Sequence, residues 1–310
     1  YHRLYAHKSY KANKVVEVLI LWFATMASQG SALGWAADHR KHHQYVDTAR
    51  DPYSIKRGFW HAHMFWFMKR RPPYDFGKVP DLMRNKLLRF QHEYYAWLVV
   101  GTNSVATLAV WALTGDLAGA FIISWWTRLF FTHHATFFIN SLAHTWGAKP
   151  YAREQTAVDN YLMAFLTFGE GYHNYHHSFP NDYRNGVRWW HFDPTKWLIW
   201  LLAQAGLATD LRRIDTWVAK RRALIEDKNA LLKQLHTRAR ARKAALERAL
   251  EAAARRYTVR VVKLRQAIAT WQQTRKRQAK ERIRLHRRAL RAEWRHWKRL
   301  VRAVRTIPAA

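Results

Sequence analysis

The sequence predicts an all-α integral membrane protein with a histidine-rich cap, followed by a long basic helical tail. Three observations lead to this prediction. Residues 94–114 and 117–140 are apolar segments long enough to cross a bilayer, which needs roughly 20 such residues. Three groups of histidines lie outside these segments. From residue 215 to residue 307 the chain contains neither glycine nor proline and is rich in good helix formers.

The two apolar segments are expected to form a tight helical hairpin, because only Gly115 and Asp116 separate them. The first segment carries no charge. The second contains Arg128, His133 and His134, which are costly against lipid and should therefore face protein or water. The alternative is a pair of buried helices in a soluble protein.

Charges around the hairpin predict its orientation. Positive residues mark the cytoplasmic side of a membrane protein, and they flank both ends of the hairpin, whereas its tip carries only Asp116. Both ends are therefore expected in the cytoplasm, together with all the histidine groups. The positive residues are Lys69, Arg70, Arg71, Lys78, Arg84, Lys86 and Arg89 before the hairpin, and Lys149 and Arg153 after it.

Two further apolar stretches are too short to cross. Residues 15–28 are interrupted by Glu17 and are expected to form an interfacial or buried helix. Residues 196–208 are expected to lie in the membrane interface. The aromatic content of 15% fits such a location, since aromatic side chains favour the boundary between lipid and water.

The histidine groups have the spacing of metal ligands. Two groups place three histidines each at positions i, i+3 and i+4, so each trio would share one helical face: His39, His42 and His43, and His173, His176 and His177. The first group, His2 and His7, spans about 140° of an α-helix and converges only if the helix ends or unwinds. Sulfur-ligated sites are excluded because the chain has no cysteine. We therefore predict a nitrogen-rich site for one or two transition metals.

The tail carries most of the charge. Residues 211–310 contain 31 Lys/Arg and 7 Asp/Glu, a net charge of +24, against +32 for the chain. Two apolar seams with 4-3-4-3 spacing predict one or two long amphipathic helices with coiled-coil-like packing: Tyr257, Val261, Leu264, Ile268 and Trp271, and Leu290, Trp294, Trp297, Val301 and Val304. Three interpretations stay open, namely a solvated helix, docking on anionic lipid and incidental nucleic-acid binding. The tryptophans favour membrane contact, and no specific nucleic acid is expected.

Four motifs follow one another along the first two thirds of the chain: HRLYAHKSYKA, WAADHRKHHQYVDTARDPYS, NSLAHTWG and GEGYHNYHHSFPNDYR. In order, spacing and flanking residues they resemble the membrane-bound fatty acid desaturases of the stearoyl-CoA, or Delta-9, type. The resemblance covers residues 1–213 and implies a desaturase domain there, with residues 214–310 as a polybasic tail without a counterpart. The ending WWHFDPTKWLIWLLAQAGLA is similar to the bacterial branch, which implies a bacterial inner membrane with the metal site facing the cytoplasm.

The resemblance implies a four-span fold whose cytosolic cap holds two irons. The first two spans would precede Tyr1, and there is no initiator Met, so we expect an N-terminally truncated fragment. It also implies that Asn140 contacts one metal through water, and that His144 is a ligand. The full ligand set would be His2, His7, His39, His42, His43, His144, His173, His176 and His177. The other nine histidines are interpreted as ordinary packing or surface residues.

The same resemblance implies a substrate path. Gln29, Trp35 and Thr136 would shape the tunnel that presents the acyl chain to the metals. Arg70 and Arg71 would meet an anionic head group such as the phosphates of coenzyme A. The plainer interpretations are ordinary packing for the first three residues and positive-inside charge for the two arginines.

The implied reaction is desaturation. A saturated acyl chain, carried by coenzyme A or a lipid, would react with O₂ and two electrons to give a cis double bond and water. No side chain beyond the metal centre is assigned to catalysis, since the cofactor supplies the difficult chemistry. The electrons would come from a separate ferredoxin or cytochrome, because no electron-carrier motif is visible. Carboxylates near the groups are candidates to orient the imidazoles: Asp38, Asp47, Asp51, Glu170 and Asp182.

Three alternatives compete with desaturation. An acyl or alkyl hydroxylase would use the same site. A non-catalytic membrane adaptor would act through the basic tail. A zinc hydrolase is the weakest alternative, because catalytic zinc needs only three protein ligands.

Overall fold

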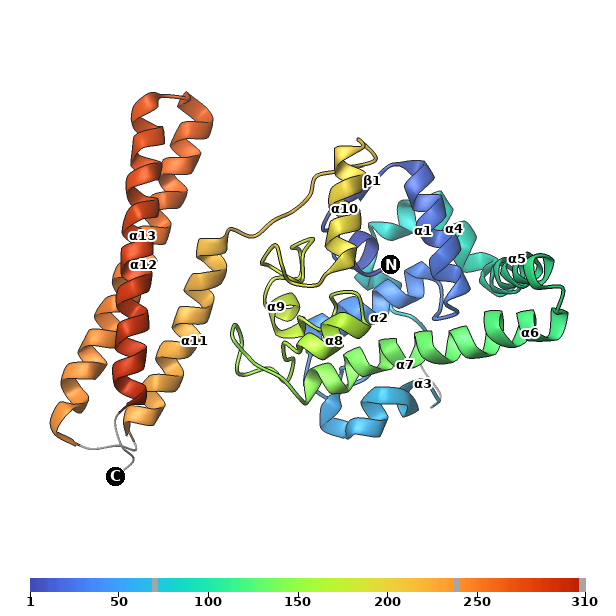
Figure 1. The fold of residues 1–310 in the computed structure, drawn as a ribbon, viewed down its shortest axis with the longest axis horizontal. Coiled ribbons are helices and arrows are strands. Elements are labelled where there is room, and N and C mark those ends of the chain that lie inside the picture. Colours follow the sequence, from blue (N-terminus) through green and yellow to red (C-terminus); the bar gives the residue numbers. More distant parts are fainter. Residues whose placement is uncertain (69–71, 237–239, 307–310) are drawn as a thin grey trace. The chain divides into compact units, whose positions relative to one another are not determined.

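The computed structural model describes residues 1–68, 72–236 and 240–306, and it is mostly helical (Figure 1), as predicted. In the described part the only sheet is a two-stranded antiparallel one, in which β1 (Lys11–Ala12) pairs with β2 (Ala208–Thr209). The chain divides into two compact units. One comprises Tyr1–Lys149 with Glu154–Arg213, and the other Pro150–Arg153 with Ile214–Ala310.

The first unit is built from helices of very different lengths. In chain order they are η1 (His2–Ala6), α1 (Lys14–Met26), α2 (Ala32–Tyr45), η2 (Ile55–Arg57), η3 (His61–Phe65), α3 (Trp66–Met68), η4 (Phe76–Lys78), η5 (Leu82–Arg84), α4 (Lys86–Glu93), α5 (Tyr95–Thr114), α6 (Leu117–Phe121), η6 (Ile122–Thr127), α7 (Arg128–Asn140), η7 (Leu142–His144), α8 (Tyr161–Leu166), α9 (His173–Ser178) and α10 (Pro194–Gln204).

Helix α2 is fixed in place at its start and along one face. The Ser31 side chain accepts a hydrogen bond from the Gly34 backbone N–H (3.2 Å), which caps the helix. The Gln91 side chain of α4 accepts a hydrogen bond from the Ala32 backbone N–H. Leu33 and Ala36 are completely buried in the core of this unit. These contacts hold the helix that carries the second histidine group.

Helix α5 is, among the described residues, the one helix that is long and apolar enough to cross a membrane. Only 17% of its most apolar 18-residue stretch is buried inside the structure. It ends at Gly115, whose φ of 71° is a left-handed conformation that favours glycine. The chain then reverses into α6, and α5 contacts α6 and η6 but diverges from α7 (Figure 1).

The second predicted span, residues 117–140, is helical throughout but is not one regular α-helix, because the wide turn η6 separates α6 from α7. Its polar side chains face protein, as expected. Arg128 donates hydrogen bonds to the Met26 backbone oxygen and to the Asn103 side chain. His133 lies 2.8 Å from the Ala27 backbone oxygen, and His134 lies 3.0 Å from His63.

The two shorter apolar stretches form helices with exposed apolar faces. Val15 and Phe23 of α1 are each 66% exposed, and Leu198 and Leu201 of α10 are more than half exposed. Asn13 caps α1, and Asp193 caps α10. The polar face of α1 packs inward through Glu17 and Thr25.

The described part of the second unit contains three helices: α11 (Thr216–His236), α12 (Arg240–Thr274) and α13 (Arg277–Arg305). Helices α12 and α13 run side by side as a hairpin (Figure 1). The two predicted seams meet in one core, with Tyr257, Leu290 and Trp297 essentially inaccessible to solvent. Trp294 packs half-buried against the same core. The tryptophans therefore serve helix packing, and the expectation that they contact a membrane is wrong.

We expect Trp297→Ala to destabilise the second unit by about 3–5 kcal/mol, since it leaves a large cavity in a closed core. Leu285→Ala is the matched control, because Leu285 on the same helix is 60% exposed. Thermal melts of the full chain, followed by helical circular dichroism, provide the measurement. Equal melting curves for the two variants would contradict the packing assigned to the seam.

Candidate metal centre

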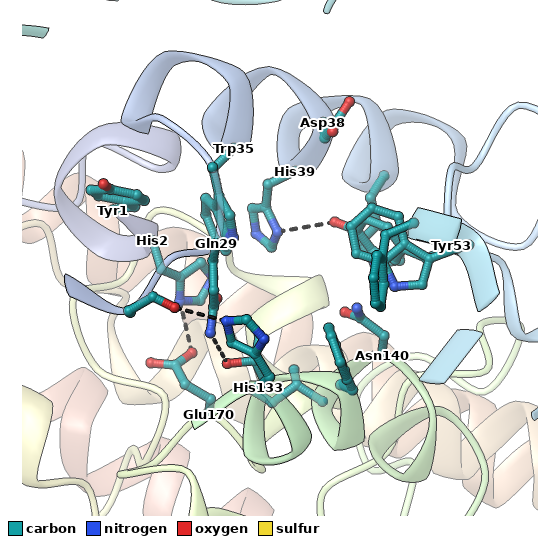
Figure 2. Close-up of a pocket in the computed structure, with 18 of the residues that line it drawn as sticks. Tyr1, His2, Gln29, Trp35, Asp38, His39, Tyr53, His133, Asn140 and Glu170 are labelled. Carbon is teal, nitrogen blue, oxygen red and sulfur yellow. Dashed lines mark hydrogen bonds and ion pairs between the residues drawn. The ribbon is translucent and has the colours of Figure 1, made fainter. Parts of the chain in front are cut away.

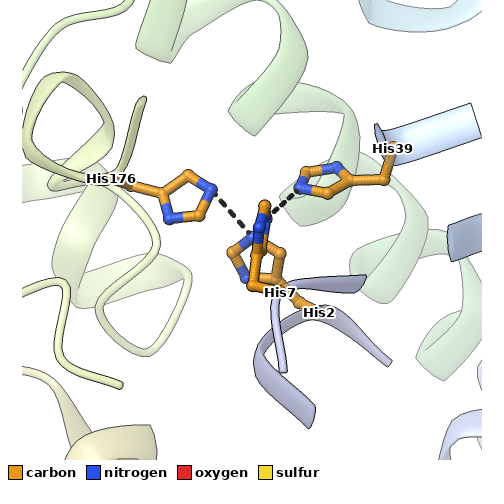
Figure 3. A group of neighbouring side chains, drawn as sticks. All are labelled: His2, His7, His39 and His176. Atoms are coloured by element: carbon orange, nitrogen blue, oxygen red, sulfur yellow. Dashed lines mark hydrogen bonds between the residues drawn. The ribbon is translucent and has the colours of Figure 1, made fainter. Parts of the chain in front are cut away.

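Eight histidines form two groups in the first unit. Group A consists of His2, His7, His39 and His176, and group B of His42, His144, His173 and His177. In each group the candidate ligand nitrogens all lie within 4.8 Å of one another. Figure 3 shows the four rings of group A turned towards one point from η1, α2 and α9.

The nitrogen spacings fit ligands around a common ion. In group A, His7 Nε2 lies 2.8 Å from His39 Nε2, and His2 Nε2 lies 3.1 Å from His176 Nε2. In group B, His173 Nε2 lies 3.1 Å from the Nε2 atoms of both His144 and His177. Nitrogens bound at about 2.0–2.1 Å from one metal lie about 2.8–3.4 Å apart in right-angled or tetrahedral arrangements. The residues therefore fit one metal per group.

His43, the ninth predicted ligand, lies where the two groups meet. Its Nε2 is 3.0 Å from His176 Nε2 of group A. Its ring stacks on His177 of group B at 4.3 Å between centroids. The structure thus brings all nine predicted histidines together.

Each predicted trio is divided between the groups. His39 of α2 belongs to group A and His42 to group B, while in α9 His176 belongs to A and His173 to B. An α-helix turns by about 100° per residue, so positions i and i+3 diverge by about 60° around the helix axis. This divergence lets one short helix serve two metals.

The first histidine pair converges through an unusual turn. Residues His2–Ala6 form a π-helical turn, in which the His7 backbone N–H bonds to the His2 carbonyl at 3.1 Å. Such i→i+5 turns are rare and are often found at functional sites. Because the wider turn nearly superposes residues five apart, the rings of His2 and His7 lie 4.8 Å apart. This is the unwinding that the pair requires.

Close packing sets the start of α9. A Cβ atom on Gly171 would lie 2.1 Å from the Ala164 backbone nitrogen, so no larger residue fits between α8 and the strand-like segment before His173. The Asn160 backbone N–H donates to the Gly171 carbonyl at 2.8 Å. The loop is therefore held against α8, and this places His173 and the rest of α9.

Carboxylates fix the orientation of two ligands. His2 Nδ1 lies 2.7 Å from Glu170, and His42 Nδ1 lies 2.9 Å from Asp51. Each carboxylate accepts the Nδ1 proton, so the neutral ring keeps a bare Nε2 that faces its group. Burial raises the pKa of Glu170, but the neighbouring Arg3 guanidinium and the His2 ring together outweigh this effect and hold the pKa well below its usual range. The acid is thus ionised and able to accept.

A hydroxyl relay orients His144. The relay residue, Thr156, was not predicted from the sequence. His144 Nδ1 lies 2.7 Å from Thr156 Oγ1, and that hydroxyl donates to Asp47 Oδ1 at 2.5 Å. The hydroxyl has one proton, so it must accept from the imidazole N–H. Asp47 also accepts from the Thr156 backbone N–H, which holds Asp47 at a left-handed φ of 64°. Thr156 follows His144 by 12 positions, and no local sequence pattern predicts that it contacts His144.

The other candidate carboxylates have separate roles. Asp182 accepts hydrogen bonds from the Tyr175 hydroxyl and from Arg184. Asp38 lines the wall of a cavity beside the metal groups. Tyr53, not singled out from the sequence, lies 3.4 Å from His39 Nδ1.

Burial keeps the imidazoles neutral. Burial and, to a smaller extent, the neighbouring histidines lower the pKa of His173 to about 3. Burial likewise holds the pKa values of six other site histidines well below the usual range: His7, His39, His43, His144, His176 and His177. Neutral imidazole is the form that binds metals.

A cavity of about 500 Å³ reaches both groups. Figure 2 shows part of its wall. It touches His2 and His39 of group A and His42 and His173 of group B. Much of the remaining wall is apolar or aromatic. These wall residues include Ala24, Trp35, Trp66, Phe67, Phe137 and Ile139.

All the predicted substrate-path residues in the described range line this cavity, as does Asn140. Gln29 donates a hydrogen bond to Thr136 Oγ1 at 2.8 Å, which joins the α1–α2 connection to α7. Trp35 stacks on His39 with 4.7 Å between centroids and 15° between planes. Arg70 and Arg71 lie outside the described residues.

A second cavity of about 470 Å³ adjoins the first, since Asp38 and Trp66 line both. No sequence pattern predicted it. Its wall combines three acids, Asp38, Asp51 and Asp75, with four basic side chains, which are Lys41, Arg50, Arg57 and Lys78. This basic cavity can accept an anionic group while an attached apolar chain occupies the first cavity.

We expect Thr156→Val to weaken metal binding about 10–100-fold, because it removes the hydroxyl that orients His144 without changing side-chain volume much. Thr156→Ser keeps the relay and should bind metal like the unchanged protein. Competition between the purified protein and a chelator, read as metal retained per chain, provides the measurement. Equal retention by both variants would show that the relay does not support the site.

Comparison with known proteins places the chain in a family. The fatty acid desaturase family matches residues 1–213. A probable acyl-CoA desaturase of Schizosaccharomyces pombe is 42% identical over 214 residues, which cover 68% of this chain and 45% of that protein. Acyl-CoA desaturase 1 of Saccharomyces cerevisiae is 42% identical over 218 residues, covering 69% and 43%.

The stearoyl-CoA desaturase of Homo sapiens is 35% identical over 221 residues, covering 69% of this chain and 62% of that protein. The chain thus spans less than half the length of the two yeast relatives. The matched region contains every histidine of groups A and B, together with His43. This chain belongs to the fatty acid desaturase family.

Proposed function

We propose that the protein is an O₂-dependent acyl desaturase that introduces a cis double bond into a saturated acyl chain, most simply an acyl-CoA. The observation that carries the proposal is the opening of both four-histidine groups onto one largely apolar cavity. An unactivated CH₂ has no acidic proton for a side chain to remove, so the reaction needs a metal oxidant. The relatives named acyl-CoA desaturases support this substrate class.

Nine histidines would hold two irons, with His43 at the junction of the groups. Imidazole nitrogen suits iron and leaves coordination positions for other ligands. When bound, the metals supply the activation of O₂ and the oxidation of the acyl chain. Asn140 would act through a water molecule, since its side chain lines the cavity (Figure 2). A zinc hydrolase is disfavoured, because four histidines per ion leave no position for the catalytic water.

The protein's own contribution is binding and orientation. The apolar wall would take up the acyl chain and exclude water from the reacting carbons. The Gln29–Thr136 hydrogen bond would set the shape of the cavity opposite the histidines, and thereby which carbon lies nearest the metals. Glu170, Asp51 and the Thr156 relay would keep the imidazoles in their metal-binding tautomers.

The basic cavity would bind the head group of the substrate. Its lysines and arginines match the phosphates of coenzyme A in charge. It continues from the acyl cavity at Asp38 and Trp66, as one bound acyl-CoA requires. Arg70 and Arg71 stay predictions for the same role.

The balanced reaction fixes what a partner must provide. The acyl chain loses two hydrogen atoms, and these, with two electrons and two protons, reduce O₂ to two water molecules. The electrons would come from a separate ferredoxin or cytochrome. A Delta-9 position for the double bond stays a prediction.

Anchoring in a bilayer accounts for the exposed apolar helices. Helix α5 and residues 117–140 would cross it, while α1 and α10 would lie along its surface with their apolar faces in lipid. The basic flanks favour a cytoplasmic metal site. A bacterial inner membrane and the bacterial branch of the family stay predictions.

Expression in a host without its own desaturase tests the proposal. A new monounsaturated fatty acid should appear in the membrane lipids, as seen by gas chromatography and mass spectrometry. It should vanish with His176→Ala, which removes a ligand of group A. Hydroxylated acids in place of unsaturated ones would identify a hydroxylase. Absence of any product from folded protein with two bound irons and a supplied donor would contradict both.

We expect Lys41→Gln to raise the KM for acyl-CoA several-fold with little change in kcat, because it weakens head-group binding away from the metals. Lys11→Gln is the matched control, since Lys11 is 76% exposed and pairs with Asp210. Steady-state rates over a range of acyl-CoA concentrations provide the measurement. A fall in kcat alone would contradict the assignment of this cavity to the head group.

A further inference from the structure

Helix α13 carries its positive charges on one face. Eleven of its twelve basic residues fall within a sector of about 120° on an ideal helix and extend over about 40 Å. All eleven are exposed. We name them the basic stripe: Arg277, Lys280, Arg284, Arg287, Arg288, Arg291, Arg295, Lys298, Arg299, Arg302 and Arg305.

The stripe has almost no compensation within the chain. Helix α13 contains two acidic residues, Glu281 and Glu293. Glu281 pairs with Arg277 at 3.4 Å, and Glu293 pairs with Arg256 of α12 at 3.2 Å. Among the described residues, Arg277 is thus the only member of the stripe in an ion pair with a carboxylate. Like charges three and four positions apart destabilise a helix, so an external polyanion would relieve the repulsion.

Packing explains why the charges form a stripe. The apolar seam of α13, from Ile283 through Leu290 and Trp297 to Val304, is buried in the core of the second unit. The stripe lies beside this seam, and the centres of the two are roughly a third of a turn apart. The charged face therefore remains available when the bundle is fully folded.

We propose that the basic stripe docks on a bilayer of anionic phospholipids. Ten arginine or lysine head groups with no carboxylate partner would lie in a nearly straight row against a flat array of phosphates. Arginine, which makes up nine of the eleven, binds phosphate through two parallel hydrogen bonds. This role is separate from the desaturase chemistry proposed above, but it rests on the proposed anchoring of α5 in a bilayer.

Two observations favour lipid over nucleic acid. The same chain carries α5, an apolar helix with little of its surface buried. With α5 in a bilayer, the chain would always be tethered close to phospholipid head groups. Binding of single-stranded nucleic acid relies on exposed aromatic side chains that stack on bases. In this unit Trp271, Trp294 and Trp297 are buried or half-buried in the core instead.

The test uses the full chain held in nanodiscs of zwitterionic lipid. Vesicles of phosphatidylcholine, with or without phosphatidylglycerol, are added and separated by flotation. The stripe variant carries Arg284→Gln, Arg288→Gln, Arg291→Gln and Arg295→Gln. The control carries four equal charge changes at exposed positions of α12, namely Arg248→Gln, Arg255→Gln, Lys263→Gln and Arg265→Gln. A third variant replaces the four stripe arginines by lysine, and circular dichroism verifies helix content.

The unchanged protein should float with the anionic vesicles only. The stripe variant should lose binding by a factor on the order of ten or more, while the lysine variant and the α12 control retain most of it. Inorganic phosphate at the same phosphate concentration should not compete. Three results would overturn the proposal: no flotation of the unchanged protein, equal losses in the stripe variant and the α12 control, or displacement from vesicles by duplex DNA at equal phosphate concentration.

Discussion

The structure of the first unit depends on one constraint, the packing of nine imidazoles that face one another, seven of which are buried. The Nδ1–H groups of His2, His42 and His144 donate hydrogen bonds to Glu170, Asp51 and the Thr156 hydroxyl, respectively. The Nε2 lone pairs of these rings are therefore directed into the groups. Converging lone pairs repel, and burial deprives them of water. A bound cation removes both penalties together. The strained φ of Asp47 and the wide turn of η1 are local costs that such a centre can offset.

Helix periodicity predicts which residues approach each other, but it does not predict how they are divided. The i, i+3, i+4 spacing correctly indicated that each trio shares a face. It could not indicate that the face is about 100° wide, so that His42 joins His144 while His39 joins His7. That division depends on the distance between α2, α9 and η7, which the tertiary fold determines. Thr156 was missed for the same reason, since its role depends on its contact with Asp47, 109 positions earlier.

The tail shows the same limit in another form. Heptad-like spacing predicts an apolar seam, but it does not predict which surface covers that seam. From the sequence, Trp294 and Trp297 suited lipid as well as helix packing. In the structure α12 and α13 cover each other's seams, with Trp297 1% exposed. The spans illustrate the converse, because the hydropathy of residues 117–140 indicated a helix but not the wide turn η6 within it.

The two units therefore pose complementary electrostatic problems. Residues 1–210 carry a modest net charge of +8, with 22 basic and 14 acidic residues, and many of these charges are paired or buried. Their unsatisfied feature is a cluster of lone pairs, which a small cation in the interior resolves. Residues 211–310 carry +24 on the surface of a closed apolar core. Their unsatisfied feature is mutual repulsion of cations, which an extended anion outside would relieve. Because the proposed metals would be internal and the proposed anion external, each could be removed experimentally without disturbing the other.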